Sequence, residues 1–108
     1  MQITESYLQG LCKKWQDLLG LAHWKIEVRI VRGIEINNNC GQNDYSFINE
    51  TSLIRLKTPD DYHGYFPYDI EVSLVHELLH IIFDIATSAD NEYYEQALDR
   101  TARALVRR

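Results

Sequence analysis

The segment DIEVSLVHELLHIIFDIA, residues 69–86, decides how this chain is expected to fold. Aliphatic and aromatic residues occupy nearly every turn of it, a pattern typical of a helix that is buried almost all round. The polar residues inside it include His76, Glu77 and His80, in an H-E-x-x-H arrangement. Asp69 directly precedes the apolar run and is a suitable N-cap. We therefore predict a buried helix that carries three ionisable side chains at its centre.

The spacing of these three side chains predicts a metal site. Residues four apart stand one above the other on one face of a helix, so His76 and His80 can both direct a ring nitrogen at one ion. Glu77 projects beside that ion, where a general base for a zinc-bound water is needed. Burying two imidazoles and a carboxylate without partners is costly. The segment thus predicts a Zn²⁺ site with His76 and His80 as ligands and Glu77 as the catalytic base.

A catalytic zinc ion normally has a third protein ligand. The carboxylates that follow the motif are the candidates, and they are Asp84, Asp90, Glu92 and Glu95. The helix expected over residues 91–106 has an inner face formed by Leu98, Ala102 and Leu105. One step back along this stripe lies Glu95, which we predict as the third ligand. Glu92 is the alternative if the helix begins late.

Other side chains near the motif are candidates for supporting roles. His63 is a candidate for lining the cleft, for donating to an oxyanion or for replacing the carboxylate ligand. One of the neighbouring tyrosines is a candidate oxyanion donor, and these are Tyr62, Tyr65, Tyr68, Tyr93 and Tyr94. Packing is the default interpretation for each of these residues. Cys40 is expected to be a free thiol, although a fourth ligand from Cys40 or His63 would indicate a structural zinc site.

The remaining sequence predicts an α+β domain. Residues 4–20 form an amphipathic pattern with Thr4 as the cap, and residues 24–30 alternate strictly between apolar and polar. Shorter strands are expected near 34–36 and 45–48, on either side of a turn cluster over 37–44. A further strand over 52–57 ends before Pro59. The prediction is a mixed or antiparallel sheet of about three or four strands, with the helices packed on one side of it.

Length and composition limit the possible classes of protein. The 108 residues are expected to form one domain, residues 1–108, and the net charge of −5 argues against a nucleic-acid surface. No apolar run approaches the roughly 20 residues that span a membrane, and the N-terminus lacks the pattern of a secretory signal. Cys12 and Cys40 form no C-x-x-C pair. We therefore expect a cytoplasmic protein.

Three segments together resemble the zincin-like metallopeptidases. They are Trp24–Val28, Val75–His80, and Glu95–Leu98 followed by Ala102 and Leu105. The chain looks most like small, uncharacterised metallopeptidases of phages and bacteria, and more distantly like the ImmA/IrrE and SprT-like families. In the ImmA/IrrE type a Glu on the helix after the motif completes the metal site, and Glu95 matches it. The chain departs from these families in its short interval between His80 and Glu95, and it has no cysteine cluster or appended helix-turn-helix.

The resemblance and the motif together predict a zinc-dependent hydrolase that cleaves peptide bonds in a protein or peptide substrate. The strand over 52–57 is the candidate sheet edge on which an extended peptide would lie. A non-enzymatic binding or regulatory module, in which the metal only holds the last two helices together, is the alternative from a different class. A hydrolase of non-peptide amides is a third interpretation.

Overall fold

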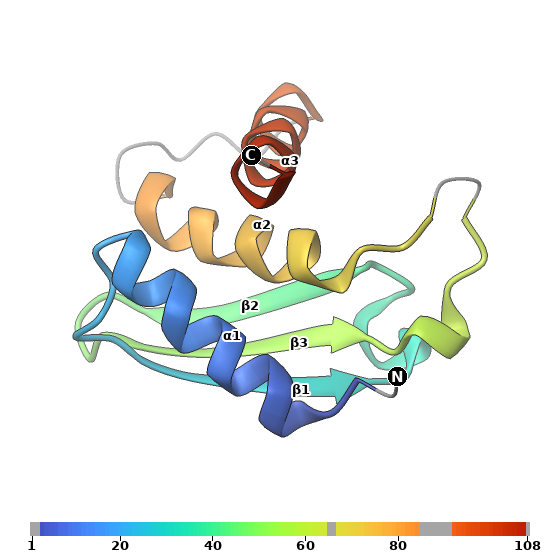
Figure 1. The fold of residues 1–108 in the computed structure, drawn as a ribbon, viewed down its shortest axis with the longest axis horizontal. Coiled ribbons are helices and arrows are strands. Elements are labelled where there is room, and N and C mark those ends of the chain that lie inside the picture. Colours follow the sequence, from blue (N-terminus) through green and yellow to red (C-terminus); the bar gives the residue numbers. More distant parts are fainter. Residues whose placement is uncertain (1–2, 65–66, 85–91, 108) are drawn as a thin grey trace.

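The described residues form a sheet of three strands in the order β1–β3–β2 (Figure 1). The computed structural model describes residues 3–64, 67–84 and 92–107. Strand β1 (Lys25–Val31) pairs in parallel with β3 (Thr51–Lys57), and β2 (Gly41–Ser46) pairs antiparallel with β3. The predicted α+β class is confirmed, and of the two predicted sheet types, mixed and antiparallel, the described sheet is mixed.

The three described helices lie on one side of this sheet. Helices α1 (Glu5–Leu18) and α2 (Ile70–Phe83) cover the same face, and α3 (Glu92–Arg107) stacks on α2, farther from the strands (Figure 1). The side chain of Thr4 caps α1 by accepting a hydrogen bond from the Tyr7 amide, and Asp69 caps α2 in the same manner. None of the described helices is long and apolar enough to cross a membrane.

Helix α2 is apolar almost all round because it is packed on both sides. Its Leu74, Val75 and Leu78 are fully buried. Toward the sheet, the core continues through the apolar side chains of alternate strand positions, which are Ile26, Val28, Ile54 and Leu56. Toward α3, it continues through Leu98 and Ala102. This central position holds α2, and the motif that it carries, in one orientation relative to the rest of the domain.

The segment between β1 and β3 was partly predicted wrongly. Residues 34–36, expected to be a strand, lie in the short 3₁₀ helix η1 (Gly33–Ile36). Strand β2 begins at Gly41, within the predicted turn cluster, and ends at Ser46, whereas a strand was expected near 45–48. The residues of β2 have low strand propensity, and backbone pairing with β3 overrides it.

The prediction that residues 52–57 form the edge of the sheet is also wrong. Strand β3 is the central strand, with β1 on one side and β2 on the other. A sequence pattern indicates which side chains of a strand are buried, but it does not indicate how many strands pair with it. The edges of the sheet are therefore β1 and β2.

Candidate metal centre

An open cleft of about 870 Å³ lies between β2, α2 and α3, and part of the loop before α2 also lines it. Its volume lies within the range of small-molecule and cofactor sites, roughly 300–1,000 Å³. Strand β2 forms one wall, and the histidine-bearing side of α2 faces it. The residues predicted to act together from the motif, His76, Glu77 and His80, all line this one cleft.

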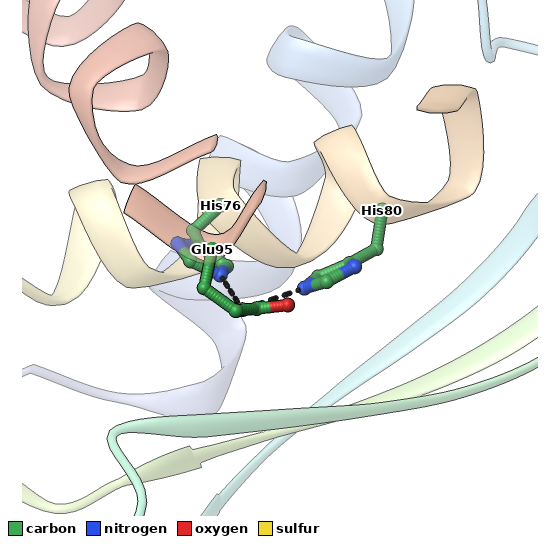
Figure 2. Close-up of side chains that lie close together, drawn as sticks. All are labelled: His76, His80 and Glu95. Carbon is green, nitrogen blue, oxygen red and sulfur yellow. Dashed lines mark hydrogen bonds and ion pairs between the residues drawn. The ribbon is translucent and has the colours of Figure 1, made fainter. Parts of the chain in front are cut away.

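Two imidazoles and one carboxylate converge in the cleft (Figure 2). One oxygen of Glu95 lies 3.0 Å from His76 Nε2 and 3.3 Å from His80 Nε2. The ligand atoms of the three residues all lie within 4.8 Å of one another. Helix α2 supplies the two imidazoles from adjacent turns, and α3 supplies the carboxylate from above.

These separations fit a first-row metal ion. Four ligand atoms placed tetrahedrally at 2.0–2.1 Å from an ion are about 3.3 Å from one another. The two separations from Glu95 Oε1, 3.0 and 3.3 Å, are close to that value, and the two histidine ligand atoms lie within 4.8 Å of each other. Two imidazole nitrogens with one carboxylate oxygen form a donor set that suits zinc and other first-row metals. Both histidine side chains are mostly buried, with 16% exposure, so the arrangement is held by packing.

Among the four carboxylates considered as the third ligand, the structure brings Glu95 to the two imidazoles. Asp84 lies on the Nδ1 side of His80, away from the point where the Nε2 atoms converge. Asp90 is outside the described residues. Glu92 begins α3, and its side chain is not among those described.

Glu77 is buried in the wall of the cleft beside β2. Its side chain is 8% exposed, and its carboxylate packs against Gly41, where an added Cβ would lie 3.0 Å from Oε2. Burial raises the pKa of this carboxyl, and the nearby imidazoles of His76 and His80 oppose the increase only in part. A carboxylate with a raised pKa is a stronger proton acceptor than one in water, as a general base requires.

Asp84 connects three elements around His80, a role that the sequence analysis missed. Both of its oxygens lie 3.2 Å from His80 Nδ1. Tyr45 of β2 donates a hydrogen bond of 2.5 Å to Asp84, and Tyr94 of α3 donates another. Burial alone would raise the pKa of Asp84, but these hydrogen bonds outweigh it and lower the pKa. The signal available in the sequence was the four-residue step from His80 to Asp84, which places both on one helix face.

The carboxylates around His80 change the pKa of its imidazole. Burial would lower the pKa of its imidazole, but the negative charges of Glu77, Asp84 and Glu95 outweigh burial and raise the pKa. Tyr94 also packs edge-on against the His80 ring, and burial together with Asp84 raises the pKa of its phenol.

The other tyrosine candidates have different positions. Tyr62 and Tyr68 stack on each other at the cleft, and the Tyr68 hydroxyl donates to the Lys57 carbonyl over 2.7 Å. Tyr93 is 82% exposed. Tyr65 lies outside the described residues.

Two further candidates are absent from the cluster of potential ligands found in the described residues. Cys40 is exposed and lines the cleft, but it does not join His76, His80 and Glu95. His63 is exposed, and it is not among the cleft-lining residues. The described part of the chain thus brings together three residues that could hold a metal ion.

Comparison of the chain with known protein families, with curated proteins and with solved structures found no match.

Proposed function

We propose that this domain is a zinc-dependent hydrolase that cleaves peptide bonds, with the minimal fold of a zincin-like metallopeptidase. His76, His80 and Glu95 would hold the ion, and Glu77 would act as the general base. The observation that carries the proposal is the convergence of three ligand atoms in an open cleft whose wall also holds a buried carboxylate. The H-E-x-x-H spacing has a mechanistic reason only when these features occur together.

In the proposed reaction, the ion would supply Lewis acidity and Glu77 would transfer the proton. A zinc ion in this donor set supplies Lewis acidity, which makes a water more acidic and a carbonyl more electrophilic. Glu77 accepts the proton of the attacking water and then delivers it to the nitrogen of the departing amine. The raised pKa of Glu77 suits both transfers, because the group must take up a proton and release it in one turnover. The packing of its side chain against Gly41 limits the positions that the carboxylate can adopt.

Strand β2 is the edge that fits an extended peptide. The Lys57 amide donates to the Cys40 carbonyl, so Cys40 and Lys57 are a hydrogen-bonded pair of the antiparallel ladder. Such pairs alternate along the ladder, and the backbone groups of Gly41 and Asn43 are therefore directed away from β3. An extended peptide can pair with this outer side, next to Glu77, by adding a strand to the sheet.

A second function, a binding module with a structural metal, is favoured by one observation. Glu95 lies on α3, which packs mainly against α2, so an ion would fasten the outermost helix to the domain. Glu77 favours the enzyme instead. A metal staple gains nothing from a buried carboxylate beside it, and burying that group has a free-energy cost.

The test is metal content and peptide hydrolysis in wild type and three variants. We expect one equivalent of zinc in wild type, its loss in Glu95→Ala, and its retention in Glu77→Gln with hydrolysis abolished. Glu71→Gln is the matched control, because Glu71 lies on the same helix but accepts a hydrogen bond from Trp15 instead of lining the cleft. We expect it to keep both zinc and activity.

Each other outcome of this test has a defined meaning. Wild-type turnover in Glu77→Gln would contradict the assigned base. Zinc bound by wild type without hydrolysis of any member of a broad peptide library would favour the structural module. A wild type that binds no added metal would overturn the metal centre itself.

A further inference from the structure

Asp84 receives contacts from three elements of the fold at once. It follows α2 as its C-cap and is reached by His80 from α2, by Tyr45 from β2 and by Tyr94 from α3. Tyr45 donates to Oδ2 and Tyr94 to Oδ1, so each carboxylate oxygen has its own phenol. A carboxylate held at both oxygens has little rotational freedom. The Asp84 carboxylate can therefore fix the orientation of the His80 ring.

The ring of His80 has a different neighbour at each nitrogen. Nδ1 lies 3.2 Å from the Asp84 oxygens, whereas Nε2 lies 3.3 Å from Glu95 on the side of the predicted ion. Both neighbours are carboxylates, which only accept hydrogen bonds when ionised, so a neutral His80 ring can donate to one of them at a time. When Nε2 binds an ion, the proton must lie on Nδ1, where Asp84 accepts the hydrogen bond. A neutral imidazole with its proton on Nδ1 has its lone pair on Nε2. The contact to Asp84 therefore favours the tautomer that binds a metal through Nε2.

His76 provides an internal comparison, because none of the described residues gives its Nδ1 an equivalent partner. The nearest carboxylate to its Nδ1 is Asp99, at 3.7 Å, which is too long for a hydrogen bond. Asp99 instead pairs with Arg103 over 2.9 Å. Within the described residues, the two imidazoles of the motif are thus held differently, because His80 has a carboxylate hydrogen-bonded to its Nδ1 and His76 does not.

We propose that Asp84 is a positioning residue that holds the His80 ring with Nε2 directed at the metal, and that Tyr45 and Tyr94 fix Asp84 in turn. The inference rests on the metal centre proposed above. Partners of this kind set the tautomer and orientation of a ligating imidazole, and their removal typically weakens metal binding by roughly 10- to 100-fold. Because its phenols come from β2 and α3, Asp84 also ties the ligand geometry to both walls of the cleft.

The first test measures zinc affinity by competition with a chromophoric chelator. Asp84→Asn keeps the size of the side chain but removes its charge, and we expect zinc binding to weaken by roughly 10- to 100-fold. Asp99→Asn is the matched control, and its effect should be much smaller because no hydrogen bond to a ring is lost. Equal affinities of wild type and Asp84→Asn would overturn the positioning role while leaving the metal centre intact. Absence of zinc binding by wild type would overturn both.

A second measurement needs no variant and decides the question if Asp84→Asn fails to fold. Ring-nitrogen NMR of the zinc-loaded wild type distinguishes the nitrogen bound to the metal from the one that carries a proton. We expect His80 to bind through Nε2 and to keep a slowly exchanging proton on Nδ1. Coordination through Nδ1, or a rapidly exchanging Nδ1 proton, would overturn the proposal.

Discussion

The two edge strands of the sheet, β1 and β2, differ in whether side chains occupy their outward backbone groups. At the β1 edge, the side chain of Gln9 donates to the Ile26 carbonyl over 2.7 Å and accepts from the Val28 amide over 3.0 Å. Glu5 accepts from the Ile30 amide over 2.8 Å. Helix α1 thus occupies the outward backbone groups of β1 with its own side chains, as a neighbouring strand would.

At the β2 edge, the polar side chains point elsewhere. The side-chain amide of Asn43 donates through Nδ2 to the backbone carbonyl of Glu77 in α2, and its Oδ1 accepts from the Ser52 hydroxyl. Asn43 thus joins β2 to both α2 and β3. In the described part of the chain, no strand pairs with the outer side of β2, and this side borders the cleft. Gln9 thus pairs with the outward backbone groups of β1, whereas Asn43 joins β2 to α2 and leaves the outward backbone groups of β2 unoccupied by its side chain. The α1 side of the sheet is therefore closed by side-chain hydrogen bonds, whereas the outer side of β2 remains open to the cleft where we propose that a substrate binds.

The largest expected effect lies at the closed edge. We expect Gln9→Ala to lower the free energy of unfolding by about 2 kcal/mol, because two partly buried backbone groups of β1 lose their partner. Chemical denaturation measures the change. Lys13→Ala, on the exposed side of α1, controls for the effect of alanine on the helix and should change the free energy little. Zinc affinity should stay at the wild-type value in Gln9→Ala, and a loss of affinity would break the comparison.

The next effect is expected at the open edge. Gly41→Ala introduces a Cβ that would lie 3.0 Å from Glu77 Oε2 and 3.1 Å from Leu56 Cδ2, so the carboxylate must move by a few tenths of an ångström. We expect kcat for peptide hydrolysis to fall on the order of tenfold, since catalytic groups are sensitive to small displacements. Zinc content should not change, because His76, His80 and Glu95 keep their positions.

Gly10→Ala is the matched substitution on the other side of the molecule. Gly10 lies within α1, and an added Cβ would meet nothing within 4 Å. Alanine should increase the free energy of unfolding by about 0.5–1 kcal/mol, through helix propensity, without changing kcat. Equal loss of activity in both glycine variants would show that Glu77 is not the group that Gly41→Ala displaces.

The last prediction concerns the reactivity of the two thiols, which differs between the two sides of the molecule. Cys12 of α1 is fully buried, and burial raises its pKa to about 12, so almost no thiolate is present near pH 8. Cys40 is exposed at the cleft. We expect alkylation of the folded protein to label Cys40 alone, with Cys12 labelled only in denaturant, as peptide mass spectrometry would show. Labelling of both thiols in the folded protein would contradict a closed α1 side.

The parts of the structure that follow from local pattern were predictable from the sequence. The alternation in β1, the caps Thr4 and Asp69, and the helical stripe leading to Glu95 each depend on residues close together in the chain. The position of His76 and His80 on one helix face follows for the same reason.

The remaining features depend on contacts between distant segments. Nothing in the sequence of β3 indicates that it pairs with β1 and β2 together, and so it was taken for an edge. The contacts of Asp84 with Tyr45 and Tyr94 join residues from three elements, and only the His80–Asp84 step could be read locally. Long-range pairing also overrides the weak strand propensity of β2.

The unusual composition of β2 has a further consequence for the protein at high concentration. An unpaired strand edge is a template for any other extended chain, including β2 of a second copy, and such contacts lead to aggregation. Strand β2 is only six residues long, and its first four, Gly-Gln-Asn-Asp, include an exposed charge at Asp44. A segment of this kind adds little affinity of its own to an edge-to-edge contact. The domain can therefore keep one edge of the sheet open to the cleft while disfavouring its own assembly into fibres.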